Sequence, residues 1–274
     1  MTESERVNIP AYVDHSFLEP DRGLEGFDRF CDECLEYELA AACVPVFWVK
    51  RAVARLGAKV PVSGVVAFPR GLEGTNAKVA AVRQCMAEGA RELDVVGTWT
   101  AIKCGEPDEA LRDARAVVEA ARAENPDVYI KLIPEIPELT REEKLLACDM
   151  VARSGADCLK TQAAGRKETT LDDVRLVRGA LPDHVQVKAS ISEVRNVADV
   201  ECLIALGATR IGTDYPVEIA REWRGLQPAL SAGLRLDMLG AAAVLRGRPQ
   251  GDAQQRGQIS LVSGLRFELR APPA

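Results

Sequence analysis

The stretch LLACDMVARSGADCLKT, residues 145–161, contains one complete helix-to-strand unit of this chain. Its apolar residues recur at helical spacing, and Gly155 ends the helix in the manner of a C-terminal glycine. Only a short strand fits between this glycine and the polar run that begins at Thr161. The unit therefore places Lys160 at the carboxyl end of a strand. The side of the helix predicted to be buried carries Leu145, Leu146, Met150 and Val151.

The same unit recurs along the chain, and the strand VQVKA at 185–189 also ends near a lysine, Lys188. Strands are predicted at residues 12–15, 40–44, 60–68, 92–96, 128–133, 157–161, 185–189 and 209–213. Helices are predicted between them at 26–38, 47–56, 76–88, 107–124, 141–153, 171–180 and 197–206. Strands separated by a helix each time pair in parallel, and eight such units in about 220 residues favour a closed barrel.

The predicted fold is therefore α/β, a single (β/α)8 TIM barrel over residues 1–224, followed by a C-terminal extension over 225–274. In the extension, residues 226–245 are compatible with a helix, 247–258 with a polar loop and 259–269 with a strand. No glycine-rich nucleotide-binding motif follows the first strand, which also counts against an open nucleotide-binding sheet. The extension either covers one end of the barrel or contributes to a dimer interface, and a homodimer is expected.

Composition excludes several classes of protein. The chain has 274 residues, 47% of them hydrophobic, a net charge of −6 and a pI near 5.2. No basic cluster suited to phosphate backbones is present, so we expect no nucleic-acid partner. No run of about 18 to 20 apolar residues and no secretory signal are found, which predicts a cytoplasmic protein that does not bind membranes.

The cysteines are expected to be free thiols that pack as small hydrophobic groups. Cys31 and Cys34 form a CxxC, but no second CxxC exists and the chain has two histidines, His15 and His184. The pair is expected to share one turn of a helix, so no metal site is predicted. The other thiols placed in predicted helices and strands are Cys43, Cys85, Cys148, Cys158 and Cys202.

Charged residues gather at the predicted carboxyl ends of the strands, where the active site of such a barrel lies. A strand-end lysine often extends its ammonium group into water without any chemical role. Lysines at the ends of two consecutive strands favour chemistry, because like charges close together destabilise each other. A neutral lysine amine can attack a carbonyl to form an iminium, and a carboxylate can then remove a proton to leave an enamine. The strand-end set is Asp14, Cys43, Asp94, Lys131, Lys160 and Lys188.

The runs YVDHSFLEP (12–20), ELDVV (92–96), GADCLKT (155–161), VQVKA (185–189) and GATRIGT (207–213) resemble those of the deoxyribose-phosphate aldolases. The resemblance covers roughly residues 8–220 and implies a class I aldolase that needs no cofactor. It implies that Lys160 is the Schiff-base lysine, that Lys188 is the neighbouring cation that favours its uncharged form, and that Asp94 relays protons. The candidate substrate-binding residues are Asp14, Cys43, Lys131, Thr161, Gln162, Ser190, Gly212 and Asp214.

Three loops depart from the family pattern on the side of the barrel mouth that holds the substrate phosphate in the family. The family's Lys-Thr-Ser-Thr-Gly reads KTQAAG at 160–165, ISE at 191–193 replaces a pair of glycines, and Asp214 and Tyr215 replace two serines. Side chains at glycine positions obstruct the approach of backbone N–H groups to an anion, and a carboxylate repels phosphate. Arg166, Lys167 or Arg195 could restore the positive charge.

The sequence thus predicts a Schiff-base aldolase that acts on a small aldehyde, ketone or sugar-like substrate lacking the phosphate, or carrying a polar or cationic group near Asp214. One alternative is a true deoxyribose-phosphate aldolase with a rebuilt phosphate site. A second is a C–C bond-forming lyase that uses a pyruvate-like ketone as its donor. A third is a non-catalytic barrel that binds a sugar-like ligand, because a fold does not determine a function.

Overall fold

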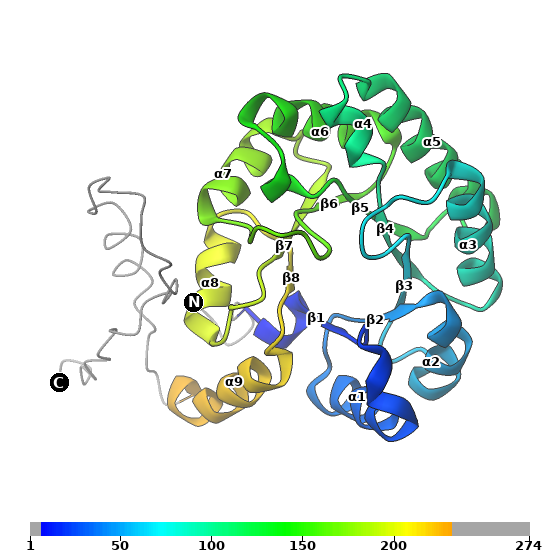
Figure 1. Ribbon diagram of the computed structural model, residues 1–274. Coiled ribbons are helices and arrows are strands. Elements are labelled where there is room, and N and C mark those ends of the chain that lie inside the picture. The colour runs from blue at the N-terminus through cyan, green and yellow to red at the C-terminus, as the bar shows by residue number, and fades with distance from the viewer. Residues whose placement is uncertain (1–6, 232–274) are drawn as a thin grey trace, which may run out of the picture.

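The computed structural model describes residues 7–231, and its eight strands form a closed parallel barrel in the order β1 to β8 (Figure 1). The predicted (β/α)8 TIM barrel is therefore confirmed. The strands are β1 Val13–Ser16, β2 Ala41–Pro45, β3 Val62–Val66, β4 Glu92–Val96, β5 Tyr129–Ile133, β6 Cys158–Lys160, β7 Gln186–Ser190 and β8 Arg210–Gly212.

A ring of helices surrounds the strands (Figure 1). The α-helices are α1 Gly23–Tyr37, α2 Val49–Leu56, α3 Thr75–Ala87, α4 Trp99–Lys103, α5 Pro107–Glu124, α6 Arg141–Ser154, α7 Leu171–Ala180, α8 Val197–Ala205 and α9 Pro216–Ser231. Short 3-10 helices lie at η2 Ile9–Tyr12, η3 Pro20–Arg22, η4 Val46–Trp48 and η5 Ile136–Glu138. The short helix α4 was not anticipated from the sequence.

Helix α6 is positioned by signals that are local in the sequence. Thr140 and Glu143 form a capping box at its start, and Gly155 ends it in the left-handed conformation with φ 85°. The capping box satisfies backbone N–H groups that the helix leaves free, and the left-handed Gly155 turns the chain out of the helix, so α6 ends at Ser154 and β6 begins at Cys158. Lys160 is consequently the last residue of β6, as the spacing predicted.

The prediction of the buried side of α6 was partly wrong. Leu145 and Leu146 are 46% and 41% exposed. At 100° per residue, Leu145 falls almost opposite the centre of the stripe that faces the barrel. Met150 and Val151 are buried as expected, and the buried face consists of Ala147, Cys148, Met150, Val151 and Ser154.

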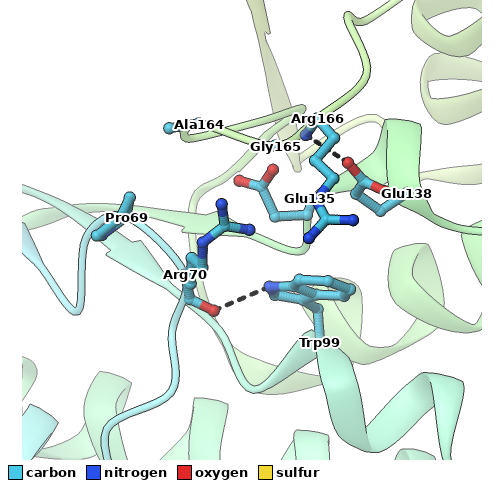
Figure 2. Close-up of a pocket in the computed structure, with 8 residues that line it drawn as sticks. All are labelled: Pro69, Arg70, Trp99, Glu135, Glu138, Ala164, Gly165 and Arg166. Atoms are coloured by element: carbon cyan, nitrogen blue, oxygen red, sulfur yellow. Dashed lines mark hydrogen bonds between the residues drawn. The ribbon is translucent and has the colours of Figure 1, made fainter.

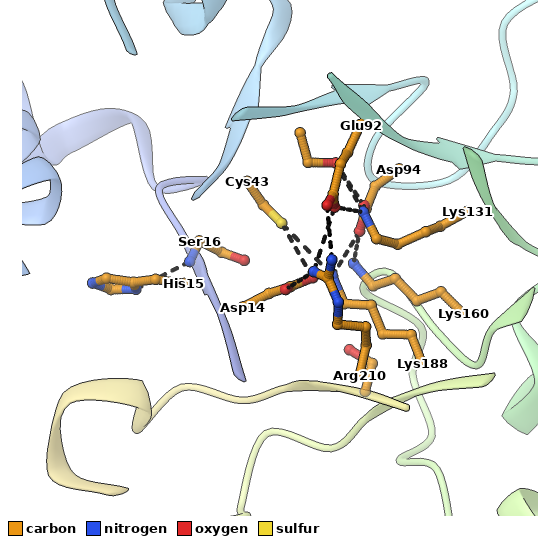
Figure 3. A network of polar contacts seen from close by, with 12 residues as sticks. Asp14, His15, Ser16, Cys43, Glu92, Asp94, Lys131, Lys160, Lys188 and Arg210 are labelled. Atoms are coloured by element: carbon orange, nitrogen blue, oxygen red, sulfur yellow. Dashed lines mark hydrogen bonds and ion pairs between the residues drawn. The ribbon is translucent and has the colours of Figure 1, made fainter. Parts of the chain in front are cut away.

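Successive side chains of each strand point alternately toward the surrounding helices and into the barrel. In β4, Leu93 and Val95 face the helices and belong to the apolar core, whereas Asp94 points into the barrel toward the lysines (Figure 3). The strand register sets Asp94 opposite Lys131, and Lys160 opposite Lys188. The apolar core thus lies between strands and helices, while the barrel interior collects charged side chains.

Helix α9 crosses the expected domain boundary at residues 224/225. It contacts η2, α1 and β1, so it closes the ring of helices beside the first strand. The strand expected at 259–269, the loop at 247–258 and most of the helix at 226–245 lie outside the described residues. Within 7–231, no helix is long and apolar enough to cross a membrane.

All eight cysteines are free thiols, as expected. Cys31 and Cys34 both lie on α1 and are buried in the core between this helix and the barrel.

Candidate active site

Asp94 is the centre of the charged cluster inside the barrel (Figure 3). It is fully buried, and its Oδ2 accepts hydrogen bonds from Lys160 Nζ and Lys188 Nζ, each at 2.9 Å. Its Oδ1 accepts from Lys131 Nζ and from Ser63 Oγ, each at 2.8 Å. One carboxylate therefore brings together the three lysines that the sequence placed at strand ends.

Asp14 forms the second acidic position. Its Oδ2 lies 2.5 Å from Lys188 Nζ, and its Oδ1 accepts from Arg210 at 2.6 Å. Cys43 also reaches this position, because its thiol lies 3.6 Å from Lys188 Nζ and 3.8 Å from Asp14 Oδ2. Asp14, Cys43 and Lys188 therefore meet as the sequence predicted.

Glu92 and Arg210 complete the network, and sequence reasoning missed both. Glu92 accepts from Lys131 at 2.6 Å and from Arg210 at 2.7 Å. The signal was available in the alternation, because Glu92 lies two residues before Asp94 and faces the same interior. The carboxylates of β1 and β4 thus face the three lysines, and Arg210 of β8 adds a further cation to the network.

These contacts determine the charge of the acids. Burial alone would raise the pKa of Asp94, but the ammonium groups of Lys131, Lys188 and Lys160 outweigh it and hold this pKa well below its usual range. Burial likewise opposes ionisation of Asp14, and Lys188 and Arg210 nevertheless lower its pKa. Both carboxylates are therefore ionised at neutral pH.

Lys188 is held in its charged form and Cys43 in its neutral form. Burial would lower the pKa of Lys188, but Asp14 and Asp94 raise it well above the usual value, so this lysine remains an ammonium. Burial, followed by the charge of Asp94, raises the pKa of the Cys43 thiol to about 11. Cys43 is therefore a neutral thiol beside a permanent cation and not a nucleophilic thiolate.

Lys160 differs from the other two lysines in how much of its ammonium group is engaged. Lys131 contacts Ser63, Glu92 and Asp94, and Lys188 contacts Asp14, Cys43 and Asp94. Lys160 Nζ has one contact among the described residues, Asp94 Oδ2. Its side chain is also slightly exposed, at 6%, whereas those of Lys131 and Lys188 are at 0% and 1%. Lys160 is thus the lysine with donors left for a substrate.

Asp14, Cys43 and Asp94 also have the spacing of a metal site, since one ligand atom from each lies within 4.8 Å of the others. Both carboxylates already face several cations of the chain itself. A divalent ion would have to displace Lys188 from between them, and the neutral thiol of Cys43 would have to lose its proton. The donor set therefore fits ammonium groups better than a metal.

Thr161, Gln162 and Ser190 hold two loops together at the barrel mouth. Thr161 is fully buried, and its hydroxyl accepts from Ser190 N at 3.0 Å. Gln162 Oε1 accepts from Thr169 N at 2.7 Å, and its Nε2 donates to Glu168 at 3.1 Å. These side chains brace the loops that follow β6 and β7.

Gly212 and Asp214 lie at the end of β8. A Cβ at Gly212 would lie 2.9 Å from Ser190 Oγ and 3.4 Å from Lys188 Cε, so glycine leaves room for Lys188 to reach Asp94. Asp214 is exposed, apart from the lysine cluster, and burial together with the charge of Glu168 raises its pKa. The structure therefore brings Gly212 to the cluster and leaves Asp214 at the mouth.

The lowered pKa values predict acid instability. Folding lowers the pKa of Asp94 and Asp14, so their contribution to the free energy of unfolding is complete above about pH 4 and is lost as pH falls through the folded-state values. Each carboxylate adds a slope of up to about 1.4 kcal/mol per pH unit. Urea unfolding at pH 7, 5, 4 and 3 measures this loss, and equal stability at pH 5 and 3 would contradict it.

The comparisons with known proteins agree on one family. The deoxyribose-phosphate aldolase of Brevibacillus brevis is 37% identical over 215 residues, covering 78% of this chain and 95% of its own length. The chain belongs to the deoxyribose-phosphate aldolase family. The aldolase of the same name from Thermococcus gammatolerans is 36% identical over 225 residues, covering 81% of this chain and 99% of its own. The chain is therefore a class I aldolase, an aldehyde-lyase, as predicted. No family model matches the chain.

Solved structures of aldolases share the barrel. One described as an aldolase superposes with a TM-score of 0.76 at 30% identity, covering 82% of this chain and 100% of its own. A second, the deoxyribose phosphate aldolase from Aeropyrum pernix, is described as a unique tetramer. It has a TM-score of 0.71 at 24% identity, covering 80% of this chain and 92% of its own, and supports the fold alone.

Proposed function

We propose that this aldolase forms or cleaves a C–C bond through an enamine on Lys160, with an acceptor substrate that lacks the terminal phosphate. The observation that carries the reaction type is the shared carboxylate oxygen, Asp94 Oδ2, which lies 2.9 Å from both Lys160 Nζ and Lys188 Nζ. It supports the proposal, because the proposed nucleophile, cation and proton acceptor belong to one hydrogen-bonded cluster.

The reaction proceeds through an iminium. The Lys160 amine adds to the donor carbonyl, and loss of water leaves the iminium. Asp94, directly or through a water, removes a proton from the adjacent carbon to give the enamine, whose carbon attacks the acceptor aldehyde. Addition of water then releases the product and returns the amine.

The neighbours of Lys160 support each step. Lys188 stays protonated and shares Asp94 Oδ2 with Lys160, so a second ammonium group lies beside the proposed nucleophile. Lys131 and Arg210 balance the buried carboxylates, and Asp14 with Cys43 fixes Lys188 in place. We propose that the residues that meet the substrate directly are Ser190, Gly212 and Asp214, with Thr161 and Gln162 bracing the loops.

Trapping with borohydride in the presence of acetaldehyde tests the mechanism. The expected product is a reduced adduct on Lys160, located by peptide mass mapping. An adduct on another lysine, or none, would contradict the assignment. Replacing acetaldehyde by pyruvate in the same experiment tests the alternative ketone donor.

The proposed absence of a phosphate handle is supported by carboxylates at the end of the site formed by the loops after β6, β7 and β8. Glu168 accepts hydrogen bonds from Gln162 Nε2 at 3.1 Å and from Ser192 N at 3.5 Å. A carboxylate of the chain therefore already occupies two donors that a phosphate would need. Burial, and then the charges of Glu168, Glu19 and Glu193, raise the pKa of Asp214, so Asp214 experiences negative charge from three other carboxylates. An added phosphate would be repelled.

Substrate preference gives a direct measure of this repulsion. We expect kcat/KM to be higher for 2-deoxyribose than for its 5-phosphate. Glu168→Gln removes one charge and should raise kcat/KM for the phosphate ester about five- to tenfold, with little change for the neutral sugar. Glu109→Gln, in the first turn of α5, where Glu109 pairs with Arg112, is the matched control. Efficient cleavage of the phosphate ester by the wild type would overturn the proposal.

A second candidate is a true deoxyribose-phosphate aldolase. The names of the relatives favour it, and so does Arg195, whose guanidinium lies 4.3 Å from the centre of the Tyr215 ring, one residue from Asp214. In this candidate Arg195 leaves its partner Glu193 and binds the phosphate. Loss of activity on the phosphate ester alone in Arg195→Met would support it.

We also propose assembly as a homodimer. Light scattering on the full chain measures the molar mass, and twice the chain mass of 29.7 kDa is expected.

A further inference from the structure

Glu135 is the one buried side chain in the described part of the structure with a polar atom, Oε2, that lacks a hydrogen-bond partner. It is 1% exposed and follows β5 in the left-handed conformation, with φ 50° and ψ 56°. A non-glycine residue pays a conformational cost there and keeps the conformation only when its surroundings demand it. Such residues occur disproportionately at functional sites.

The surroundings of Glu135 are the loop that follows Lys160. Its Oε1 accepts a hydrogen bond from Ala163 N, and the next residue along the chain, Ile136, donates its N–H to Thr161 O at 2.8 Å. Three residues on, Glu138 Oε1 accepts from Arg166 N at 2.5 Å and from Lys167 N at 3.1 Å. Two carboxylates after β5 therefore bind the backbone of residues 163–167.

Close packing extends this contact to Gly165. A Cβ at Gly165 would lie 2.6 Å from Glu135 Oε2 and 3.1 Å from Glu138 Oε1. Figure 2 shows the two carboxylates beside this loop, at a cavity of about 240 Å³ that Arg70 and Trp99 also line. Glycine at position 165 therefore lets the loop approach without displacing these carboxylates.

We propose that Glu135 is a positioning residue that, with Glu138, clamps the loop after β6 and so holds Lys160 in the geometry for iminium formation. Asp94 holds the amine end of Lys160 inside the barrel, while the clamp contacts the backbone just after this lysine. The lysine is therefore restrained at both ends, by Asp94 at Nζ and by the clamp through Thr161 and Ala163.

The clamp does not depend on the charge of Glu135. Burial raises the pKa of Glu135, against the opposing effect of the Ala163 and Ala164 N–H groups and of the Lys160 ammonium. The clamp needs only an oxygen acceptor for Ala163 N, which both a neutral and an ionised carboxyl provide. A glutamine at this position keeps that acceptor, whereas a leucine of similar size does not.

The experiment compares Glu135→Leu with Glu135→Gln in the full chain, with melting temperature recorded for each. For Glu135→Leu we expect kcat and the rate of borohydride trapping on Lys160 to fall on the order of 10²-fold, with KM changed less than kcat. Glu135→Gln should retain kcat within about threefold, since it preserves the hydrogen bond. Equal loss in both variants would overturn the positioning role, because it would require the carboxylate itself.

Gly165→Ala tests the clamp without removing Glu135, and remains informative if Glu135→Leu does not fold. Its Cβ pushes the loop off Oε2, so trapping on Lys160 should slow. Gly179→Ala on α7 is the matched control, because a Cβ there meets nothing within 4 Å. Wild-type trapping rates in Gly165→Ala would overturn the inference.

The inference rests on the proposed role of Lys160, and the two fail separately. If the wild type is active but carries no adduct on Lys160, the proposed function is wrong, and so is the proposed role of the clamp. If the wild type is labelled on Lys160 and Glu135→Leu and Gly165→Ala are labelled equally, only the proposed role of the clamp is wrong.

Discussion

Lys160→Ala is expected to lower kcat/KM at least roughly 10⁴-fold, because it removes the covalent route and the high effective concentration of the attached amine. Borohydride trapping with acetaldehyde should label neither Lys131 nor Lys188, since both are fully engaged in ion pairs. Steady-state kinetics and peptide mass mapping on the same preparation measure both effects.

Lys160→Arg is the control for charge. Arginine retains a cation for Asp94 but remains protonated and cannot act as the nucleophile. It should therefore be as inactive as Lys160→Ala while keeping more of the stability that the ion pair contributes. Substantial activity in either variant would show that another group forms the iminium.

Asp94→Asn should reduce kcat by roughly 10²- to 10⁴-fold, the range lost when a positioned proton acceptor is removed. It should also lower the free energy of unfolding by about 3–5 kcal/mol, because three buried ammonium groups lose the carboxylate that they share. Kinetics and urea unfolding at pH 7 test the two parts.

Lys131→Met combined with Asp94→Asn separates stability from catalysis. The double variant removes one positive and one negative charge together, so part of the lost stability should return. Activity should not return, because the proton acceptor for the iminium is still missing. Recovery of kcat in the double variant would mean that Asp94 acts through the fold and not in proton transfer.

Much of the fold was readable from local signals. Helix stops such as Gly155, capping residues such as Thr140 and the period-two pattern of the strands act over a few residues, so the order of the elements and the position of Lys160 could be predicted. The buried side of α6 was less clear, because Leu145 and Leu146 are apolar residues that the structure leaves partly exposed.

The chain by itself determined which side chains stand at the ends of the strands, because a strand's period and length place Asp94, Lys160 and Lys188 there. Only the tertiary structure decided how they are paired. Asp94 meets Lys188 across 94 residues of sequence, and Arg210 meets Glu92 across 118. The clamp at Glu135 likewise depends on a left-handed backbone and on the loop after β6. Such contacts arise from closure of the barrel, which sets strand register between distant segments and leaves no trace in local periodicity.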